Sequence, residues 1–332
     1  MAGRRVLITG VGSHMGATVA GRLAAHPHFD HVAGLDTRLP SERLDGVELI
    51  QADIRDPAMD TIVPGAQVDT VVHNQIVRRP GPGMSSRAMH DINVIGSLQL
   101  LTACERSPTI ETIVIRGSAG IYGAEPNAPQ FFGEEMAQLF PLRTRFQRDV
   151  SEIENLFANF AVRHPDVTCT MLRYQPGIGP SVDTQVTRYL AARLVPTYLG
   201  FDPRVQFVHE DDALDALMAA VERPVRGAVN VAGPGSIGLT RLIRAAGRAS
   251  LPVAAPVFGA VADAMRRLGV PSLSEDFKRL LRWGRAVDTA RLVDEVGFTP
   301  RYSTPSAVED YVSRRGGPRL LGGPRLLGGL VP

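Results

Sequence analysis

Lysine is almost absent from this sequence. Lysine and arginine together number 36 among 332 residues, and Lys278 is the only lysine. Tyrosine is also rare, and none lies between Tyr122 and Tyr174. A mechanism that needs a lysine therefore has one residue available. A Tyr–Lys pair in the middle of the chain is excluded.

Cysteine is equally sparse. The two cysteines, Cys104 and Cys169, lack the spacing of a metal site or a disulfide framework, so we expect buried, reduced thiols. Apolar runs stay below the roughly 18 residues of a membrane span, and no signal-peptide pattern precedes the first apolar strand. The formal net charge of +2 gives no reason to expect nucleic acid or a membrane as a partner. The sequence therefore predicts a cytoplasmic protein that binds neither.

The first half of the chain alternates short apolar strands with helices. Strands are predicted over 4–9, 31–36, 47–53, 68–73, 112–118 and 167–174. Helices are predicted over 13–25, 85–105 and 145–163. This alternation is typical of an α/β fold with a doubly wound parallel sheet, the Rossmann type.

The second half of the chain lacks this regular alternation of strands and helices. Helices are predicted over 186–194, 239–248, 258–268 and 275–281, and a strand–helix–strand segment over 205–232 returns to the core. We therefore expect an NAD(P)-binding Rossmann domain over 1–175 and a smaller C-terminal substrate-binding lobe over 176–315. The unit GGPRLL occurs at 316–321 and again at 322–327, which favours a flexible tail over 316–332.

A glycine-rich turn follows the first strand directly. It reads TGVGSHMG from Thr9 to Gly16 and opens onto a helix for which Ser13 is a suitable N-cap. Such a turn lets the backbone approach a pyrophosphate, and the helix N-terminus attracts the anion. Asp36 ends the second strand, where a carboxylate binds the ribose 2′-hydroxyl, so NAD is favoured. Arg38 lies close enough to keep NADP as an alternative.

These features resemble the extended short-chain dehydrogenase/reductases, the NAD-dependent epimerase/dehydratase family. The turn matches that family's TGxxGxxG pattern, except that Ser13 takes the middle glycine position and Gly12 lies one residue earlier. Further matching segments are NVIGSLQLL, RGSAGIYG, RYQPGIG, FVHEDDAL and VDTARLVDEVGFTPRYS. The resemblance covers roughly 4–312 and extends to actinobacterial UDP-glucose 4-epimerase-like members with a degenerate Tyr-x-x-x-Lys motif.

The resemblance implies a set of residues around an NAD or NADP cofactor. They are Gly10, Gly12, Ser13, His14, Met15, Gly16, Asp36, Arg38, Asp53, Ile54, His73, Asn93 and Tyr174. It also implies that Ser118 holds the substrate oxygen. Homodimers are common in the family, so a homodimer through helices 85–105 and 145–163 is expected by analogy.

The proton-transfer pair of the family is missing. In the family a Tyr and a Lys lie four residues apart on the helix after the serine segment, and the Lys lowers the pKa of the Tyr. With Glu154 as the anchor of that pattern, the Tyr position falls on Phe146 and the Lys position on Val150. Pro176 replaces an Asn that usually helps to hold the substrate.

Several residues are candidates to replace the missing proton donor. Tyr122 lies four residues after Ser118 and either acts there or packs in its turn. His73 either carries a proton or supports the cofactor side. Arg145 and Arg148 lie near the Phe146 position and are either surface charges or substitutes for the pair.

Two further groups have a structural and a functional interpretation. Arg78 and Arg79 belong either to a solvated loop or to a site for an anionic substrate. His209, Asp211 and Asp212 are expected to cap the helix that follows them.

Two functions remain open at this point. The first is an atypical NAD(P)-dependent oxidoreductase, or an epimerase/dehydratase-like enzyme, that transfers hydride on a carbonyl or hydroxyl of a small molecule such as a sugar nucleotide or secondary metabolite. The second is a non-catalytic NAD(P)-binding sensor or partner subunit. Ser118 and the substrate lobe favour the enzyme.

Overall fold

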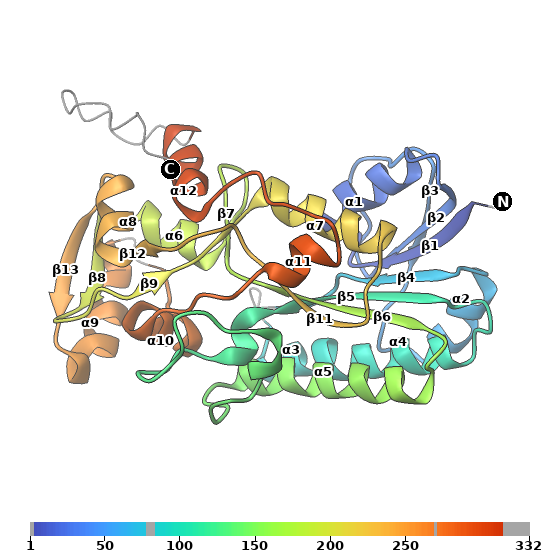
Figure 1. Cartoon of the computed structure of the whole chain (residues 1–332), viewed down its shortest axis with the longest axis horizontal. Helices are drawn as coiled ribbons and strands as arrows, with labels where there is room; N and C mark the ends of the chain where they lie inside the picture. The colour runs from blue at the N-terminus through green and yellow to red at the C-terminus, as the bar shows by residue number, and fades with distance from the viewer. Residues whose placement is uncertain (1–2, 78–83, 269–270, 315–332) are drawn as a thin grey trace.

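The computed structural model describes residues 3–77, 84–268 and 271–314 (Figure 1). A seven-stranded sheet has the order β11-β6-β5-β4-β1-β2-β3, and all its pairings are parallel. Its strands are β1 (Arg4–Thr9), β2 (Phe29–Asp36), β3 (Val47–Gln51), β4 (Thr70–His73), β5 (Thr112–Ser118), β6 (Thr168–Tyr174) and β11 (Gly227–Val231). The fold is therefore the predicted doubly wound Rossmann type.

Strand register brings the expected site residues to one edge of the sheet. Thr9 of β1 is paired with His73 of β4, and Ser118 of β5 with Tyr174 of β6. Strand order reverses between β1 and β4, where such sheets open a crevice at their carboxyl ends.

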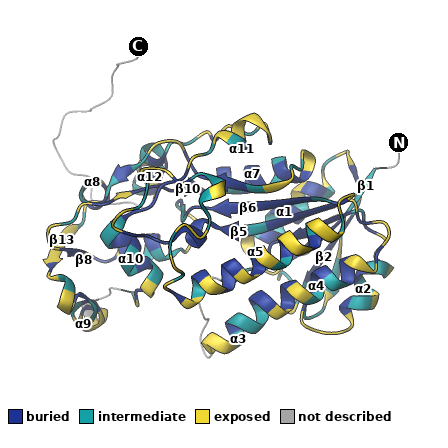
Figure 2. Ribbon diagram, turned by 60° about the horizontal axis from the view of Figure 1, so that its bottom comes forward, coloured by how far each residue is buried: buried dark blue, intermediate teal, exposed yellow. Residues whose placement is uncertain are grey.

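Helices cover both faces of the sheet (Figure 1). One layer contains α1 (His14–Ala24) and α7 (Glu210–Glu222), and the other contains α2 (Met59–Gly65), α4 (Gly96–Glu105) and α5 (Arg145–Arg163). Successive strand residues point to opposite faces, so Ile8 belongs to the first core and Leu7 to the second. Figure 2 shows α4 and α5 burying one face and exposing the other.

The smaller lobe has a hydrophobic core of its own. Tyr198 stacks on Phe258 with ring centroids 3.7 Å apart, and Tyr189 meets Phe277 edge to face. Its elements include α6 (Gln185–Ala191), β8 (Leu194–Tyr198), α8 (Leu239–Ala245), β13 (Ala249–Val253), α9 (Phe258–Ala264), α10 (Glu275–Trp283) and α12 (Thr304–Arg314). Two short strands, β7 (Gly177–Ile178) and β10 (Val208–His209), pair between this lobe and the sheet.

The predicted elements of the lobe need correction at their ends. The helices expected over 186–194 and 239–248 are too long, because α6 ends at Ala191 and α8 at Ala245. The strands that follow them, Leu194–Tyr198 (β8) and Ala249–Val253 (β13), pair in parallel and were not predicted. The helix expected over 85–105 consists of α3 (Ser86–His90), a π-helical turn η1 (Asp91–Ile95) and α4. The tail over 316–332 lies outside the described residues.

The described chain confirms the expectation for the cysteines. Cys104 and Cys169 are free and buried, as predicted, and burial raises the pKa of Cys104 to about 12 and that of Cys169 to about 11. Within the described ranges, no helix combines the length and apolar character needed to cross a bilayer.

Candidate functional site

The glycine-rich turn joins β1 to α1 in a tight geometry. Gly10 has φ +77°, which favours glycine. A Cβ on Gly16 would lie 2.1 Å from the carbonyl oxygen of Gly10, so only glycine fits there. The turn therefore has the close helix–strand packing that a pyrophosphate site requires.

Ser13, at the family's middle glycine position, is the N-cap of α1. Its Oγ donates to the Gly10 carbonyl (2.8 Å) and accepts from the Gly16 N–H (3.1 Å). The N–H groups of His14 and Met15 have no partner within the helix, because they belong to its first turn. The serine therefore reshapes the turn while leaving N–H groups available to an anion.

The Asp36 carboxylate lies beside this turn. One oxygen accepts from the N–H of Gly12 at 3.1 Å, and the other accepts from the N–H of Arg38 at 3.2 Å. These bonds hold the carboxylate at the end of β2, next to the turn. The Arg38 side chain is exposed.

Asp53 and Ile54 follow β3 and take separate roles. Asp53 forms an ion pair with Arg55, and the hydrogen bonds from Arg55 lower the pKa of the Asp53 carboxyl. The Ile54 side chain is fully buried and lies where a Cβ on Gly96 would be, so it packs against α4.

His73 and Asn93 support the site from within the protein. His73 is fully buried, its Nδ1 bonds to Thr9 Oγ1 (2.8 Å) and its Nε2 to Ser97 Oγ (2.9 Å). Burial lowers the pKa of His73 to about 4, so the ring is neutral at pH 7. Asn93 accepts from the N–H of Val77 and donates to its carbonyl, which fixes the segment after β4.

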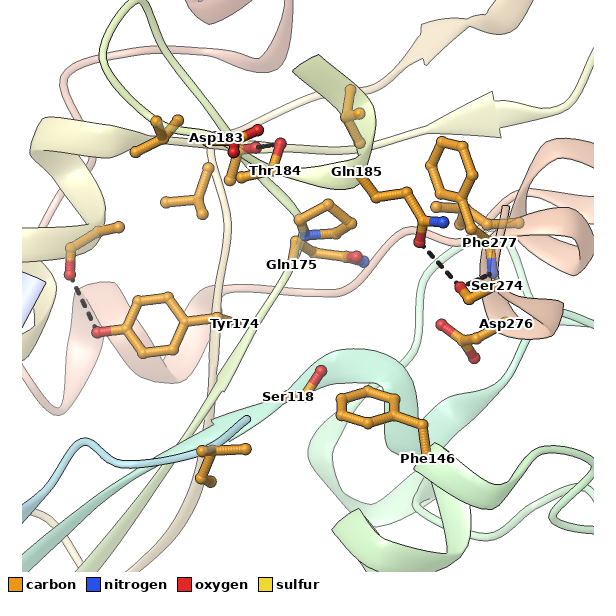
Figure 3. Close-up of a pocket in the computed structure, with 18 of the residues that line it drawn as sticks. Ser118, Phe146, Tyr174, Gln175, Asp183, Thr184, Gln185, Ser274, Asp276 and Phe277 are labelled. Carbon is orange, nitrogen blue, oxygen red and sulfur yellow. Dashed lines mark hydrogen bonds between the residues drawn. The ribbon is translucent and has the colours of Figure 1, made fainter. Parts of the chain in front are cut away.

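A cavity of about 1010 Å³ opens at the carboxyl ends of β5 and β6, facing α6 and α10 (Figure 3). His14 and Met15 of the turn line it together with Ser118 and Tyr174. The Tyr174 hydroxyl donates to the Ala213 carbonyl at 3.1 Å. The cavity therefore joins the turn to the serine at the family's catalytic position.

Phe146 forms the wall beside Ser118. Figure 3 shows its ring next to the serine hydroxyl, and both residues line the cavity. Ser118 Oγ accepts from the N–H of Gly120 at 3.1 Å. A Cβ on Gly120 would lie 2.9 Å from Phe146 Cε1, so the ring packs closely over this backbone.

The structure corrects one catalytic candidate, Tyr122. Its ring stacks on Phe132 in a buried cluster that also holds Val150, and it is not among the residues lining the cavity. Its hydroxyl donates to Asn230 (2.7 Å) and accepts from Arg173 (2.8 Å). Burial raises its pKa to about 12. Tyr122 is therefore a packing residue.

Glu154 anchors α5 to the sheet. Its carboxylate accepts two hydrogen bonds from Arg173 of β6, at 2.9 and 2.6 Å. Phe146 and Val150 lie eight and four residues earlier on the helix and share its side. The register chosen from the sequence thus puts Phe146 at the cavity and Val150 in the apolar cluster behind it.

The remaining candidates are structural or peripheral. His209 caps α7 by accepting from Asp211, and Asp212 accepts from the N–H groups of Arg301 and Tyr302. The His209 bond is the predicted helix cap, whereas the Asp212 carboxylate holds the segment before α12 and does not cap α7. Arg145 is exposed at the cavity wall, whereas Arg148 is exposed and does not line it. Arg78 and Arg79 lie outside the described residues.

Sequence reasoning missed most polar residues of the cavity wall, and Arg116, Gln175 and Arg285 are among them. The signal for Arg116 was present, because residues two apart on a strand share a face and Arg116 precedes Ser118 by two. Arg285 comes from the loop after α10, and no local pattern links it to the cavity.

Known proteins resemble this chain throughout. The family described as the NAD dependent epimerase/dehydratase family matches residues 6–232. The chain belongs to that family. An uncharacterized protein of Mycobacterium tuberculosis is 36% identical over 317 residues, which cover 94% of this chain and 84% of the relative.

Two further relatives extend this comparison. A Streptomyces protein named 3-diazoavenalumate denitrifying reductase is 27% identical over 241 residues, covering 68% of this chain and 75% of that protein. The crystal structure of a UDP-glucuronic acid 4-epimerase from Bacillus cereus, in complex with UDP-glucuronic acid and NAD, has a TM-score of 0.70 at 16% identity. It covers 94% of this chain and 98% of its own. At that identity the likeness shows the fold alone.

Proposed function

We propose that this member of the epimerase/dehydratase family is an atypical NAD-dependent oxidoreductase acting on a carbonyl or hydroxyl of a small molecule in the cytoplasm. One observation carries the proposal: Ser118 and the N-terminus of α1 open onto the same cavity. NAD(H), when bound, supplies or accepts the hydride, and the protein provides binding and orientation.

The residues of the turn fit a dinucleotide. Gly16 packs against the Gly10 carbonyl and the first turn of α1 offers N–H donors, as a pyrophosphate site requires. Asp36 lies where it would accept from a ribose hydroxyl and repel a 2′-phosphate, which favours NAD over NADP. The NAD in the Bacillus cereus structure supports this choice.

Within the cavity, Ser118 binds and orients the reacting oxygen. Phe146 excludes water beside it but has no proton to give. Tyr122 is buried elsewhere, so this proposal takes the proton from a substrate hydroxyl, from Arg145 at the cavity wall or from water that enters with the substrate. General acid catalysis contributes about 10²- to 10⁴-fold, and its loss leaves a slower or specialised hydride transfer. The reductase name of the Streptomyces relative supports the reducing direction.

A second candidate is a non-catalytic NAD(P)-binding sensor or partner subunit. The observation in its favour is that both positions of the proton-transfer pair are apolar, with Val150 inside a hydrophobic cluster. A protein of this kind binds the cofactor and stabilises its own fold without consuming it.

The test uses purified full-length protein. NADH binding is followed by its fluorescence and by the melting temperature. Turnover is then measured as NADH consumption with aldehydes, ketones and oxo acids, and as NAD reduction with UDP-glucose, whose hydroxyl groups can only be oxidised. The enzyme reading predicts NADH consumption that Ser118→Ala lowers at least tenfold and that Ser250→Ala, on the exposed part of β13, leaves unchanged. Cofactor binding without any turnover would favour the sensor, and no binding of NAD(H) would refute both.

A homodimer remains part of this proposal. Ile95 and Leu98 expose apolar side chains at the start of α4, and Val162 does so near the end of α5. These two helices are neighbours on the same side of the sheet, so they offer one partly apolar face. Ile95→Glu should convert a dimer to a monomer in sedimentation analysis.

A further inference from the structure

Arg116 is a cation of the cavity wall that forms no ion pair with any residue the structure describes. It lies two residues before Ser118 on β5, so the two side chains share a face, and both line the cavity. Its contacts among the described residues are Asn74 Oδ1 at 3.4 Å and the Tyr174 ring, whose centroid is 5.7 Å away. Its Nε is buried and has no hydrogen-bond partner there. Burial also lowers the pKa of this guanidinium.

Gln175 adds a second unused donor. The residue is fully inaccessible to bulk solvent and lines the cavity, where Figure 3 shows it above Ser118. Its Oε1 accepts from Arg285 Nε at 3.4 Å, and because arginine only donates, the amide oxygen must face Arg285. Its Nε2 then faces away and has no partner among the described residues. Arg116, Ser118 and Gln175 thus bring donor groups to one cavity wall, where Arg116 Nε and Gln175 Nε2 are covered and unpartnered among the described residues.

The acidic residues of the cavity do not neutralise Arg116. Within the described chain no ion pair joins Arg116 to a carboxylate of the cavity wall. Asp183 pairs with Arg188, Glu210 accepts from the N–H of Ser181, and Glu275 pairs with Lys278, while Asp276 acts electrostatically on Arg285. Arg143 of the wall is likewise engaged with Glu125. An unpaired, desolvated guanidinium is costly, and an anion from the ligand would offset that cost.

The rest of the wall is largely apolar. Aromatic and aliphatic side chains surround the donors, and they include Ile76, Met89, Phe146, Val186, Phe277 and Leu280. A ligand that matches this surface has an apolar body and one planar anionic group. A carboxylate meets that description, because a guanidinium binds it with two parallel hydrogen bonds.

We propose that Arg116, assisted by Gln175, binds a carboxylate of the substrate, so that the cavity selects small aromatic or otherwise apolar carboxylic acids. The reacting carbonyl of such an acid would then lie at Ser118. This last point rests on the proposed function, whereas the carboxylate site does not.

The test compares acids with their amides, which match them in shape but lack the charge. The probes are benzoate, trans-cinnamate and phenylpyruvate, each with its amide, titrated calorimetrically into NADH-saturated protein and into protein without cofactor. The native protein should bind at least one acid about tenfold or more tightly than its amide. Arg116→Met should abolish that preference, and Arg116→Lys should retain part of it. Arg148→Met removes an exposed arginine outside the cavity and should change nothing.

Thermal unfolding of the same variants separates binding from folding. If Arg116 exists to bind a ligand, Arg116→Met keeps or raises the melting temperature of the ligand-free protein, because it removes an unpaired buried charge. A fall of several degrees would make Arg116 a structural residue and overturn the proposal. So would an unchanged acid preference in Arg116→Met, or no binding of any of the three acids by the native protein.

The two proposals fail in different ways. Acid binding through Arg116 without NADH binding would refute only the oxidoreductase. NADH turnover with no preference for acids would refute only the carboxylate site. Tight binding of UDP-glucose that Arg116→Met leaves unchanged, with no acid bound, would assign the cavity to sugar nucleotides and also overturn the carboxylate site.

Discussion

The ring of Phe146 lies against Gly120 so closely that a Cβ on the glycine would be 2.9 Å from Cε1 of the ring. The contact holds an aromatic ring without a hydroxyl next to Ser118, at the position where the motif spacing predicts the family's tyrosine. Restoring the hydroxyl therefore tests directly whether proton supply beside Ser118 limits the proposed reduction.

Phe146→Tyr should fold like the native protein, because it adds one hydroxyl to a ring already at the cavity wall. It should also raise any NADH-dependent reduction, since a phenol can donate the missing proton. The gain should stay below the usual 10²- to 10⁴-fold of general acid catalysis, because no lysine lowers its pKa. Initial rates with the best carbonyl substrate measure this, and an unchanged rate would show that proton supply does not limit the reaction.

Val150→Lys should destabilise the protein. Val150 is almost fully buried in an apolar cluster, and Glu154 on the same side of α5 is already engaged by Arg173. A lysine there lacks a counter-ion, so we expect a loss of about 2–4 kcal/mol in the free energy of unfolding. Urea denaturation measures it, and Val150→Ile is the apolar control. A Val150→Lys variant as stable as the native protein would contradict this, because it would show that the space behind Phe146 accommodates a lysine side chain.

Gly16→Ala should damage both stability and cofactor binding. The added Cβ would lie 2.1 Å from the Gly10 carbonyl oxygen, which is backbone and must move. Gly21, in the same helix, has nothing within 4 Å of its Cβ position, so Gly21→Ala should stabilise α1 by about 0.5–1 kcal/mol. Melting temperatures of the two variants, with and without NADH, test the turn. Equal behaviour of the pair would contradict the packing described here.

Asp36→Ala should weaken NAD more than NADP. The substitution removes the carboxylate beside the turn together with its bonds to the N–H groups of Gly12 and Arg38. We expect the Kd for NAD to rise about tenfold, the value of one charge-assisted hydrogen bond. NADP binding should stay the same or improve, because a repulsive charge is gone. Fluorescence titration with NADH and NADPH measures both, and no change in either would remove Asp36 from the cofactor site.

His73 should make the protein less stable in acid. Its folded pKa of about 4 lies below the ordinary value of 6.5, because burial penalises the charged ring. Between these two pH values the unfolded chain therefore binds more protons than the folded protein. The contribution of the neutral His73 ring to the free energy of unfolding is full above pH 6.5 and is lost as the pH falls toward 4. The whole loss is about 3 kcal/mol. Urea titrations at pH 7.5 and 4.5 should show a smaller fall for His73→Gln than for the native protein. Equal falls would contradict a neutral, buried His73.

Local patterns predicted the parts of the structure that depend on neighbours in sequence. The turn from Thr9 to Gly16, the parallel strands and the start of α5 at Arg145 all follow from short-range signals. The strands β8 and β13 escaped prediction, because each is stabilised by pairing with the other from more than fifty residues away. Their Pro and β-branched residues make sense only in that pairing.

For the candidate site, too, the residues that local motifs define were predictable and those that depend on distant partners were not. Ser118 and Phe146 could be placed from the spacing of the family motifs, and the structure puts both at the cavity. Both alternatives for Tyr122 stayed open, because sequence distance from Ser118 does not reveal which way a side chain points after a strand ends. Its partners Arg173 and Asn230 come from neighbouring strands, β6 and β11.

The pairing of β6 with β11 also shapes how the chain is made. β6 ends at Tyr174, and its outer neighbour β11 begins only at Gly227, after α6 and β8 of the small lobe and helix α7 have been synthesised. A nascent chain therefore carries an open sheet edge while that part of the lobe emerges from the ribosome. Such edges invite pairing with other chains. This interval of synthesis should be when the protein is most prone to aggregate.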